Sequence, residues 1–320
     1  MSGTAVLPAP CEQAFVHEAL FYRGEDEWLA GTVPFISEGV DAGEPVLVVV
    51  AAERIAALRA ELDGRAEAVS FADMAEIGLN PARIIPAWRE FLDRHGNGAR
   101  PVRGIGEPIW ANRSADELVE CQRHEALLNV AFASSGAWRL LCPYDIDALD
   151  PAVIEEAQRS HPVISDADGR RPSGLCLPLD DMAAPFDQAL PDPPGDAARL
   201  VFQNGDLRSV RAFITQRATD AQLPTGRLED LVLAVNELAT NSLRHGGGRG
   251  ELRAWKSGDS LVCEIRDNGR IQDPLAGRQR PVNSAIGGRG LWIANQLCEL
   301  VQMRCLPNGN VIRLHMRIRP

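Results

Sequence analysis

The sequence predicts two domains of different class. The first is an α/β domain on a mostly parallel sheet, and the second is an α+β sandwich with helices on one face of an antiparallel sheet. Apolar runs alternate with helical patterns in the first half, as βα units do. Segments of period-two apolar alternation lie next to one another in the second half. A segment rich in proline and aspartate separates the two halves and predicts a linker.

In the first domain, residues 1–180, strands and helices are expected to alternate. The β-branched run at 46–50 indicates a strand that is buried on both faces, and 69–71 and 138–142 indicate two more. Apolar residues at helical spacing predict three helices, and Ser114 is placed to cap the last of them. These helices are expected over residues 53–62, 81–95 and 114–133.

The linker is expected at residues 181–198 and the second domain at 199–320. Two helical patterns come first, two alternating strands follow, and a loop, a helix and a final strand complete the order. The helices are predicted over 206–220, 227–245 and 290–300, and the strands over 251–256, 261–266 and 310–318.

Charge is distributed unevenly between the two halves. The chain has 33 basic and 44 acidic residues, and residues 1–198 hold 15 of the basic and 33 of the acidic ones. This acidic balance argues against general binding of nucleic acid. The second half is net basic, which favours an anion such as a nucleotide phosphate, or an acidic partner.

The sequence shows neither a secretory signal nor a membrane span. Residues 1–10 lack a basic region followed by an apolar run, and the dense apolar stretch at 46–52 is too short to cross a bilayer. We therefore expect a cytoplasmic protein that does not enter a membrane. The seven cysteines form no C-x-x-C pair, so the sequence indicates neither a zinc site nor a complete disulfide framework.

The predicted helix at 227–245 carries an acid and an amide four residues apart, Glu237 and Asn241. This spacing places both on one side of the helix. An asparagine oxygen is a suitable Mg²⁺ ligand, and a neighbouring glutamate can orient or deprotonate a nucleophile near a phosphate. Taken alone, the pair would more often be a solvated helix edge.

Two glycine-containing motifs follow. Asp267 and Gly269 come directly after a predicted strand, where an acid can accept a hydrogen bond from an exocyclic amine and a glycine lets a flat base approach. An ordinary Asp-Asn-Gly turn explains the first motif equally well. Farther on, a glycine-rich stretch opens a helix, and the backbone amides there can hold an anion. That stretch contains Gly288, Arg289, Gly290 and Leu291.

The order and spacing of these three motifs resemble the N, G1 and G2 boxes of the GHKL superfamily of ATPases and kinases. The resemblance implies a Bergerat-type ATP-binding sandwich with Mg²⁺ and ATP as cofactors. It makes Glu237 the general base, Asn241 the Mg²⁺ ligand and Asp267 the acid that reads adenine. The residues implied in nucleotide binding are Asn241, Asp267, Gly269, Gly288, Arg289, Gly290 and Leu291.

One position departs from the GHKL pattern. The G1 box often reads D-x-G-x-G, but Ile271 occupies the place of the second glycine. Residues 270–286, between the G1 and G2 boxes, correspond to the ATP lid. The departure bears on the mobility of this lid more than on adenine binding.

Within GHKL proteins, this sequence resembles the anti-sigma-factor serine kinases of the RsbW type. Histidine kinases place an acceptor histidine just before the N box, and residues 200–231 contain no histidine. The resemblance covers about 199–320. It implies a domain that binds a sigma factor and phosphorylates a serine or threonine of an anti-anti-sigma protein, and it allows a homodimer.

The first half resembles the MEDS sensory domain of DcmR-like regulators. The similar segments are residues 15–22, 43–50, 71–74 and 142–145. The resemblance implies a sensor of small-molecule ligands with a RecA-like sheet. No Walker A loop follows the strand at 46–50, and Lys256 is the only lysine in the sequence, so ATP binding is expected in the second domain.

The sequence also allows two other functions. One is a sensor histidine kinase whose acceptor lies in the first domain, at His95, His124 or His161. The other is a non-catalytic module in which ATP tunes the affinity for a partner. His17 and Cys142 lack metal-ligand spacing, so the sequence favours packed residues over a ligand site.

Overall fold

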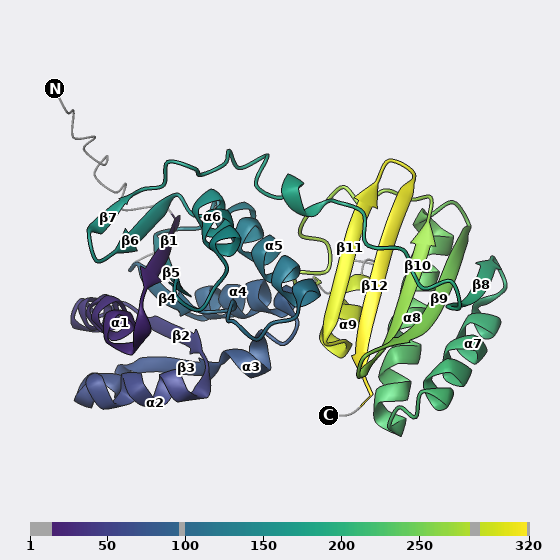
Figure 1. Cartoon of the computed structure of the whole chain (residues 1–320), viewed down its shortest axis with the longest axis horizontal. Coiled ribbons are helices and arrows are strands. Elements are labelled where there is room, and N and C mark those ends of the chain that lie inside the picture. The colour runs from purple at the N-terminus through teal and green to yellow at the C-terminus, as the bar shows by residue number, and fades with distance from the viewer. Residues whose placement is uncertain (1–14, 96–99, 282–288, 319–320) are drawn as a thin grey trace. The chain divides into compact units, whose positions relative to one another are not determined.

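The structure, a computed structural model, describes residues 15–95, 100–281 and 289–318. The chain divides into two compact units, Met1–Ala183 and Ala184–Pro320 (Figure 1). No helix in the described part of the chain is both long enough and apolar enough to cross a membrane.

The N-terminal unit is built on a sheet that is parallel except for one edge strand. Within the described residues its strand order is β3-β2-β4-β5-β1-β6-β7, and only β7 runs antiparallel to its neighbour. This confirms the mostly parallel sheet. The strands are β1 (Phe15–Tyr22), β2 (Val46–Val50), β3 (Val69–Asp73), β4 (Val102–Gly106), β5 (Trp138–Asp145), β6 (Val163–Asp166) and β7 (Gly169–Pro172).

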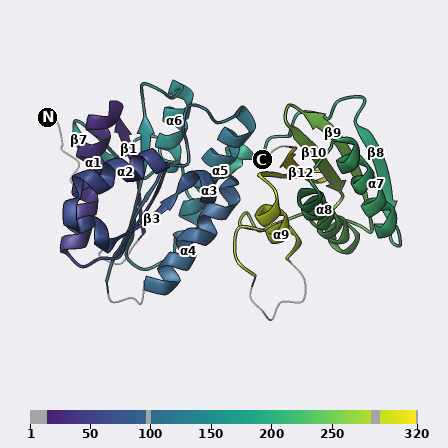
Figure 2. The ribbon, with the colours of Figure 1, turned by 90° about the horizontal axis from the view of Figure 1, so that it is seen from below.

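Helices cover both faces of this sheet (Figure 2). The helices α1 and α2 pack on one face, in a core with Leu20 of β1 and Leu141 of β5. The opposite face meets α4 and α5, where Trp88 of α4 lies beside Trp138 of β5. The helices are α1 (Gly24–Asp41), α2 (Ala52–Glu61), α3 (Met74–Ile77), α4 (Ile84–His95), α5 (Ala115–Phe132) and α6 (Pro151–Ser160), and short 3₁₀ turns span Asp63–Ala68 and Pro81–Arg83.

Local chemistry explains several of these elements. All five residues of β2 are buried, as a continuous β-branched run predicts for a central strand. Ser114 caps α5 in a reciprocal arrangement with Glu117, which is the capping box. In β4 a glycine is required, because a Cβ on Gly104 would lie 2.8 Å from the Trp88 ring. Helix α4 therefore packs closely against the sheet.

The C-terminal unit is an antiparallel sheet with helices on one face (Figure 2). The described strands have the order β11-β12-β10-β9-β8. This confirms the predicted α+β sandwich. The elements are β8 (Ala198–Gln203), α7 (Leu207–Asp220), α8 (Thr225–His245), β9 (Arg249–Ser257), β10 (Ser260–Asp267), α9 (Gly290–Leu297), β11 (Leu300–Leu306) and β12 (Gly309–Arg317), with a 3₁₀ turn at Ala184–Phe186.

One core fills the space between helices and sheet in this unit. Val210 and Ile214 of α7 meet Leu231 and Leu238 of α8 and the inward side chains of every strand in the sheet. Alternate residues on the strands face the core, as the pleat requires. The helix predicted over 290–300 ends earlier, at Leu297, and Leu300 begins β11 instead.

The other face of this sheet carries charged side chains. Glu264 of β10 is fully buried and accepts two hydrogen bonds from Arg313 of β12, at 3.0 and 2.6 Å. Arg313 also donates to the carbonyl oxygen of Pro191, and Arg304 donates to that of Gln188. The segment before β8 is therefore held on this face by hydrogen bonds from two arginine side chains to its backbone carbonyls.

Candidate functional site

The N-box residues lie on α8, beside its buried stripe. Leu238 and Ser242 face the core, whereas Glu237 and Asn241 are half-buried. Because they are separated by one helical turn, Glu237 and Asn241 project from the same edge of α8. The helix thus presents a carboxylate and an amide beside the core.

Asp267 ends β10 and is held by three hydrogen bonds. Its Oδ2 accepts from the Ser242 hydroxyl at 2.6 Å. Its Oδ1 accepts from the backbone N–H of Gly269 at 2.8 Å and from Nδ2 of Asn310 at 3.0 Å. The carboxylate is therefore fixed between α8, its own turn and β12.

Three glycines allow the backbone to close around Asp267. A Cβ on Gly246 would lie 2.5 Å from Cγ of Asp267, and one on Gly269 would lie 2.7 Å from the carbonyl oxygen of His245. Gly309 has φ +132°, and a Cβ there would lie 1.9 Å from the carbonyl oxygen of Asp267. A side chain at any of the three would force the acid or its supports to move.

The G2 box meets the N box at the first residue of α9. A Cβ on Gly290 would lie 2.5 Å from Nδ2 of Asn241 and 3.2 Å from the carbonyl oxygen of Glu237. Arg289 precedes the helix and is exposed, and Leu291 packs partly against the core. Gly288 lies outside the described residues. The structure thus brings Glu237, Asn241 and Gly290 together.

The first part of the expected lid is packed in place. Asn295 of α9 donates to the carbonyl oxygen of Gly277 at 2.9 Å, and Leu275 is buried. Ile271 packs against the core, and its N–H donates to Oδ1 of Asn310 at 3.1 Å. The residue that replaces the second G1 glycine therefore anchors the start of this segment. Residues 282–286 of the expected lid lie outside the described part.

The arrangement fits a nucleotide. A carboxylate has about four lone-pair positions, and three hydrogen bonds reach Asp267 from described residues. One position remains for an amine such as that of adenine. The first backbone amides of α9 are oriented as at any helix N-terminus and are therefore suited to a phosphate.

A pocket of about 260 Å³ lies at the same strand end, where Asp267 and Asn310 border it, but most of its lining belongs to the other face of the sheet. Val201 and Arg266 line it, whereas their neighbours Leu200 and Ile265 point into the core under the helices. The pocket is therefore not the space between α8 and α9 where the three boxes meet.

Sequence reasoning missed two residues of this site, Ser242 and Asn310. Ser242 follows Asn241 directly on a helix, where a buried serine gives no signal of its own. Asn310 is far away in sequence and reaches Asp267 only because β12 pairs with β10. Asn310 could be found only by knowing that β12 pairs with β10.

In the N-terminal unit, a buried acid lies at the carboxyl ends of the parallel strands. Glu107 follows β4 and accepts a hydrogen bond from the Tyr22 hydroxyl at 2.7 Å. Burial raises the pKa of Glu107 to about 7, although the hydrogen bond from Tyr22 and the nearby Arg54 oppose this rise. A titrating carboxyl is thus placed where parallel α/β sheets commonly bind ligands.

Comparisons with known families agree with this geometry. Residues 16–162 match the model of the methanogen/methylotroph DcmR sensory domain, MEDS. Residues 200–316 match the model of the histidine kinase-like ATPase domain. The MEDS and GHKL resemblances are therefore confirmed, and the second family assignment implies ATP binding. A search among curated proteins finds no significant match.

Two solved structures are similar over part of the chain. The RsbU and RsbW domains of Rv1364c from Mycobacterium tuberculosis match at 19% identity and a TM-score of 0.29, over 38% of this chain and 33% of that one. The Acinetobacter baumannii histidine kinase AdeS matches at 11% identity and a TM-score of 0.24, over 38% and 68%. The match thus spans a third of the first structure, and neither similarity is close enough to transfer a substrate or partner.

The fold of each unit, the three converging boxes and the two family matches lead to one assignment. This chain joins an N-terminal MEDS sensory domain to a C-terminal histidine kinase-like ATPase domain of the GHKL superfamily.

Proposed function

We propose that the C-terminal domain binds Mg-ATP and transfers the γ-phosphoryl group to a serine or threonine of an anti-anti-sigma protein. In this proposal the domain also binds a sigma factor, and the MEDS domain regulates the switch. The observation that carries the proposal is the meeting of three boxes. Ser242 holds Asp267 at 2.6 Å, and Gly290 lies against Asn241.

Each residue has a role that its surroundings support. Asp267 keeps an acceptor position for the adenine amine. Asn241 offers the neutral oxygen that Mg²⁺ accepts alongside phosphates and water. Glu237, one turn earlier on α8, is placed to accept the proton of an incoming hydroxyl group. Bound Mg-ATP supplies the phosphoryl group and the metal charge that offsets developing negative charge.

The start of α9 complements these roles. Gly290 allows a close approach to its backbone, Arg289 adds a positive charge beside the helix terminus, and Leu291 packs behind them. Gly288 is assigned to the same phosphate-binding stretch only because of its place in the glycine-rich motif. The basic balance of this half of the sequence also favours an anionic ligand.

The positions of the histidines favour a separate hydroxyl acceptor over an internal histidine. Helix α7, which precedes α8, contains no histidine. In the N-terminal unit His124 and His161 are 1% and 0% exposed, so neither side chain is accessible to a kinase site. His95, at the end of α4, is exposed and is the remaining candidate for a sensor histidine kinase.

The proposed regulatory ligand is a small molecule at the MEDS domain. A pocket of about 240 Å³ there is lined by β1, α1 and β5 residues, among them Glu18, Phe35 and Arg139. Glu18 is 5% exposed and accepts hydrogen bonds from Ser165 at 2.5 Å and Arg170 at 2.8 Å. Such a lining suits a small polar ligand with an apolar part.

The test is phosphoryl transfer from γ-labelled ATP by the full chain to candidate anti-anti-sigma proteins. The proposal predicts acid-stable phosphate on the partner and co-purification of a sigma factor. Acid-labile phosphate on the chain itself, lost in His95→Ala, would instead identify a histidine kinase. ATP binding with no transfer to any partner would identify a module in which ATP only tunes binding. A wild-type chain that binds no ATP would overturn the proposal.

A further inference from the structure

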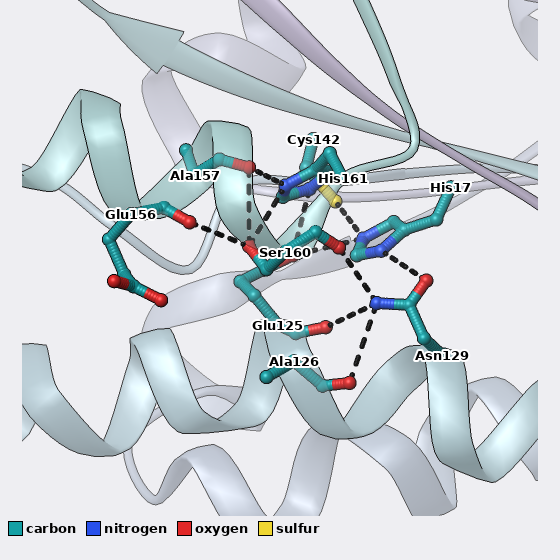
Figure 3. Close-up of polar contacts among 9 residues, drawn as sticks. All are labelled: His17, Glu125, Ala126, Asn129, Cys142, Glu156, Ala157, Ser160 and His161. Carbon is teal, nitrogen blue, oxygen red and sulfur yellow. Dashed lines mark hydrogen bonds and ion pairs between the residues drawn. The ribbon is translucent and has the colours of Figure 1, made fainter. Parts of the chain in front are cut away.

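The N-terminal unit contains a buried cluster of four side chains that has no place in the function described above. His17 comes from β1, Glu125 from α5, Cys142 from β5, and His161 directly follows α6 (Figure 3). None of the four is more than 1% exposed. They come together although His17 and His161 stand at opposite ends of the MEDS match.

The atoms that could bind a metal ion point at one another. Oε2 of Glu125 lies 3.1 Å from Nε2 of His17 and 3.3 Å from Nε2 of His161. Sγ of Cys142 lies 3.4 Å from Nε2 of His17. One ligand atom from each of the four residues lies within 4.8 Å of all the others.

Neighbouring groups determine which nitrogen of each imidazole carries hydrogen. Nδ1 of His161 lies 2.7 Å from the carbonyl oxygen of Ala157, which can only accept, so Nδ1 is the donor. Nδ1 of His17 lies 3.3 Å from Oδ1 of Asn129. The amide of Asn129 is oriented by donating from Nδ2 to the carbonyl oxygen of Ser160 at 2.7 Å. In its neutral form each imidazole therefore presents the lone pair of Nε2 to Glu125.

This arrangement leaves electron pairs facing one another in a buried space. Two Nε2 lone pairs and a carboxylate oxygen meet, and the Cys142 thiol beside Nε2 of His17 is a single, weak donor for all of them. Among the described residues, Oε1 of Glu125 and Nε2 of His161 also have no hydrogen-bond partner. Unpaired buried polar groups are costly, and a buried carboxylate requires a compensating positive charge. A cation at the centre satisfies all four side chains at once.

We propose that this cluster is a binding site for a divalent metal ion, Zn²⁺ by its donor set, held by His17, Glu125, Cys142 and His161. Zinc favours four ligands of imidazole, thiolate and carboxylate type in a tetrahedral arrangement. Bond lengths of about 2.0–2.1 Å would separate two nitrogen or oxygen ligands by roughly 3.3 Å. The Glu125 separations of 3.1 and 3.3 Å need little adjustment.

The surroundings resemble those of metal-binding histidines. Such histidines commonly donate their second ring N–H to a carbonyl or an amide oxygen, which fixes the ring. Asn129 does this for His17, and the Ala157 carbonyl does it for His161. With four protein ligands and no exposed side, the site suits a resident ion that holds β1, α5, β5 and the end of α6 together.

Metal analysis of the purified full chain tests the site, before and after removal of metal by a chelator and reconstitution with Zn²⁺ or Co²⁺. We expect one ion per chain. With Co²⁺ we expect the intense visible bands of tetrahedral coordination and a near-ultraviolet thiolate-to-cobalt band. Chelation should lower the unfolding temperature, and addition of Zn²⁺ should restore it.

The variants Cys142→Ser and Cys121→Ser provide a matched pair, because both cysteines are buried in the same unit and only Cys142 belongs to the cluster. Cys142→Ser should lose the thiolate band, and Cys121→Ser should keep it. Should Cys142→Ser fail to fold, the reversible response of the wild type to chelation still decides. A wild-type chain that binds neither ion would overturn the site, and so would a thiolate band that survives Cys142→Ser. None of these outcomes depends on ATP binding.

Discussion

The hydroxyl of Ser242 donates a hydrogen bond to Oδ2 of Asp267 at 2.6 Å, and this bond fastens α8 to the end of β10. The helix that carries Glu237 and Asn241 is therefore positioned relative to the proposed adenine-reading acid. One side-chain hydrogen bond therefore joins the helix that carries the proposed Mg²⁺ and phosphate residues to the acid proposed to bind adenine.

Removal of this hydroxyl gives the first prediction. Ser242→Ala leaves Asp267 with one partner fewer and allows its carboxylate to rotate. We expect ATP affinity to fall by about tenfold, equivalent to ~1.4 kcal/mol, as for the loss of one hydrogen bond to a charged group. Equilibrium titration with a fluorescent ATP analogue measures this. Ser209→Ala, at an exposed position on α7, should bind as wild type does, and equal affinities in both variants would contradict the assigned role.

A methyl group at the start of α9 gives the second prediction. In Gly290→Ala the new Cβ would lie 2.5 Å from Nδ2 of Asn241, so that side chain must move. We expect at least a tenfold loss of Mg²⁺-dependent ATP binding and a loss of about 1–3 kcal/mol in stability from the forced contact. The control is Gly226→Ala in the first turn of α8, where a Cβ meets open space and ATP binding should be unchanged. Normal ATP binding by Gly290→Ala would show that the close contact between Gly290 and Asn241 is not needed for ATP binding.

The third prediction separates binding from chemistry. Glu237→Gln keeps the size of the side chain but removes its ability to accept a proton. We expect ATP affinity within about twofold of wild type and transfer slower by about 10²–10⁴-fold, the usual contribution of a general base. Single-turnover transfer with labelled ATP measures the rate. Glu229→Gln, at an exposed position two turns earlier on α8, should transfer normally. Full activity of Glu237→Gln would show that Glu237 is not the general base.

The fourth prediction concerns pH and the N-terminal unit. Glu107 has a pKa of about 7 in the folded chain, mainly because of burial, against 4.5 for an unperturbed carboxyl. The folded chain therefore binds this proton more tightly, and stability falls as pH rises from about 4.5 to 7. The full effect is about 3 kcal/mol. Tyr22, Arg54 and Asp145 face the same carboxyl and stay unchanged in the test.

Glu107→Gln should remove that dependence. Urea unfolding at pH 5 and pH 8 is the measurement, and the wild type should lose more stability between the two than the variant does. Glu90→Gln, at an exposed residue of α4, should follow the wild type. A parallel pH response in wild type and Glu107→Gln would mean that the carboxyl titrates normally.

Strong local signals made much of the fold predictable. The β-branched run at 46–50 formed β2 with the predicted bounds, and Ser114 capped α5 as expected. Strand β4 gave no such signal, because Gly104 and Gly106 weaken its strand pattern and are explained only by the Trp88 ring packed over them. The strand propensity of individual residues carries no information on a close approach between elements that are distant in the sequence.

The boundary between α9 and β11 shows a second limit. The apolar residues from Leu291 to Leu300 continue the helical spacing, yet the chain turns into a strand after Cys298. Val301 and Met303 point into the core from β11, and Leu300 pairs with His315 of β12. Tertiary strand pairing overrode the local helical pattern.

The boxes of the proposed ATP site could be predicted because each is short and contiguous in the sequence. The proposed metal ligands were not, since His17, Glu125, Cys142 and His161 are scattered over four elements without a characteristic spacing. From the sequence alone, His17 and Cys142 were predicted to be packed residues and not metal ligands. Only the parallel pairing of β1 with β5, and the packing of α5 and α6 beside them, bring the four together.

Asp267 is proposed to read the adenine of ATP in the C-terminal domain. Calorimetric titration of the full chain with ATP, in the presence of Mg²⁺, tests this role. Asp267→Asn is compared with Asn268→Ala, a change at the exposed neighbouring residue. We expect saturable binding of one ATP by the wild type and by Asn268→Ala, and loss of this binding in a folded Asp267→Asn chain. Undiminished binding by Asp267→Asn, or no binding by the wild type, would contradict it.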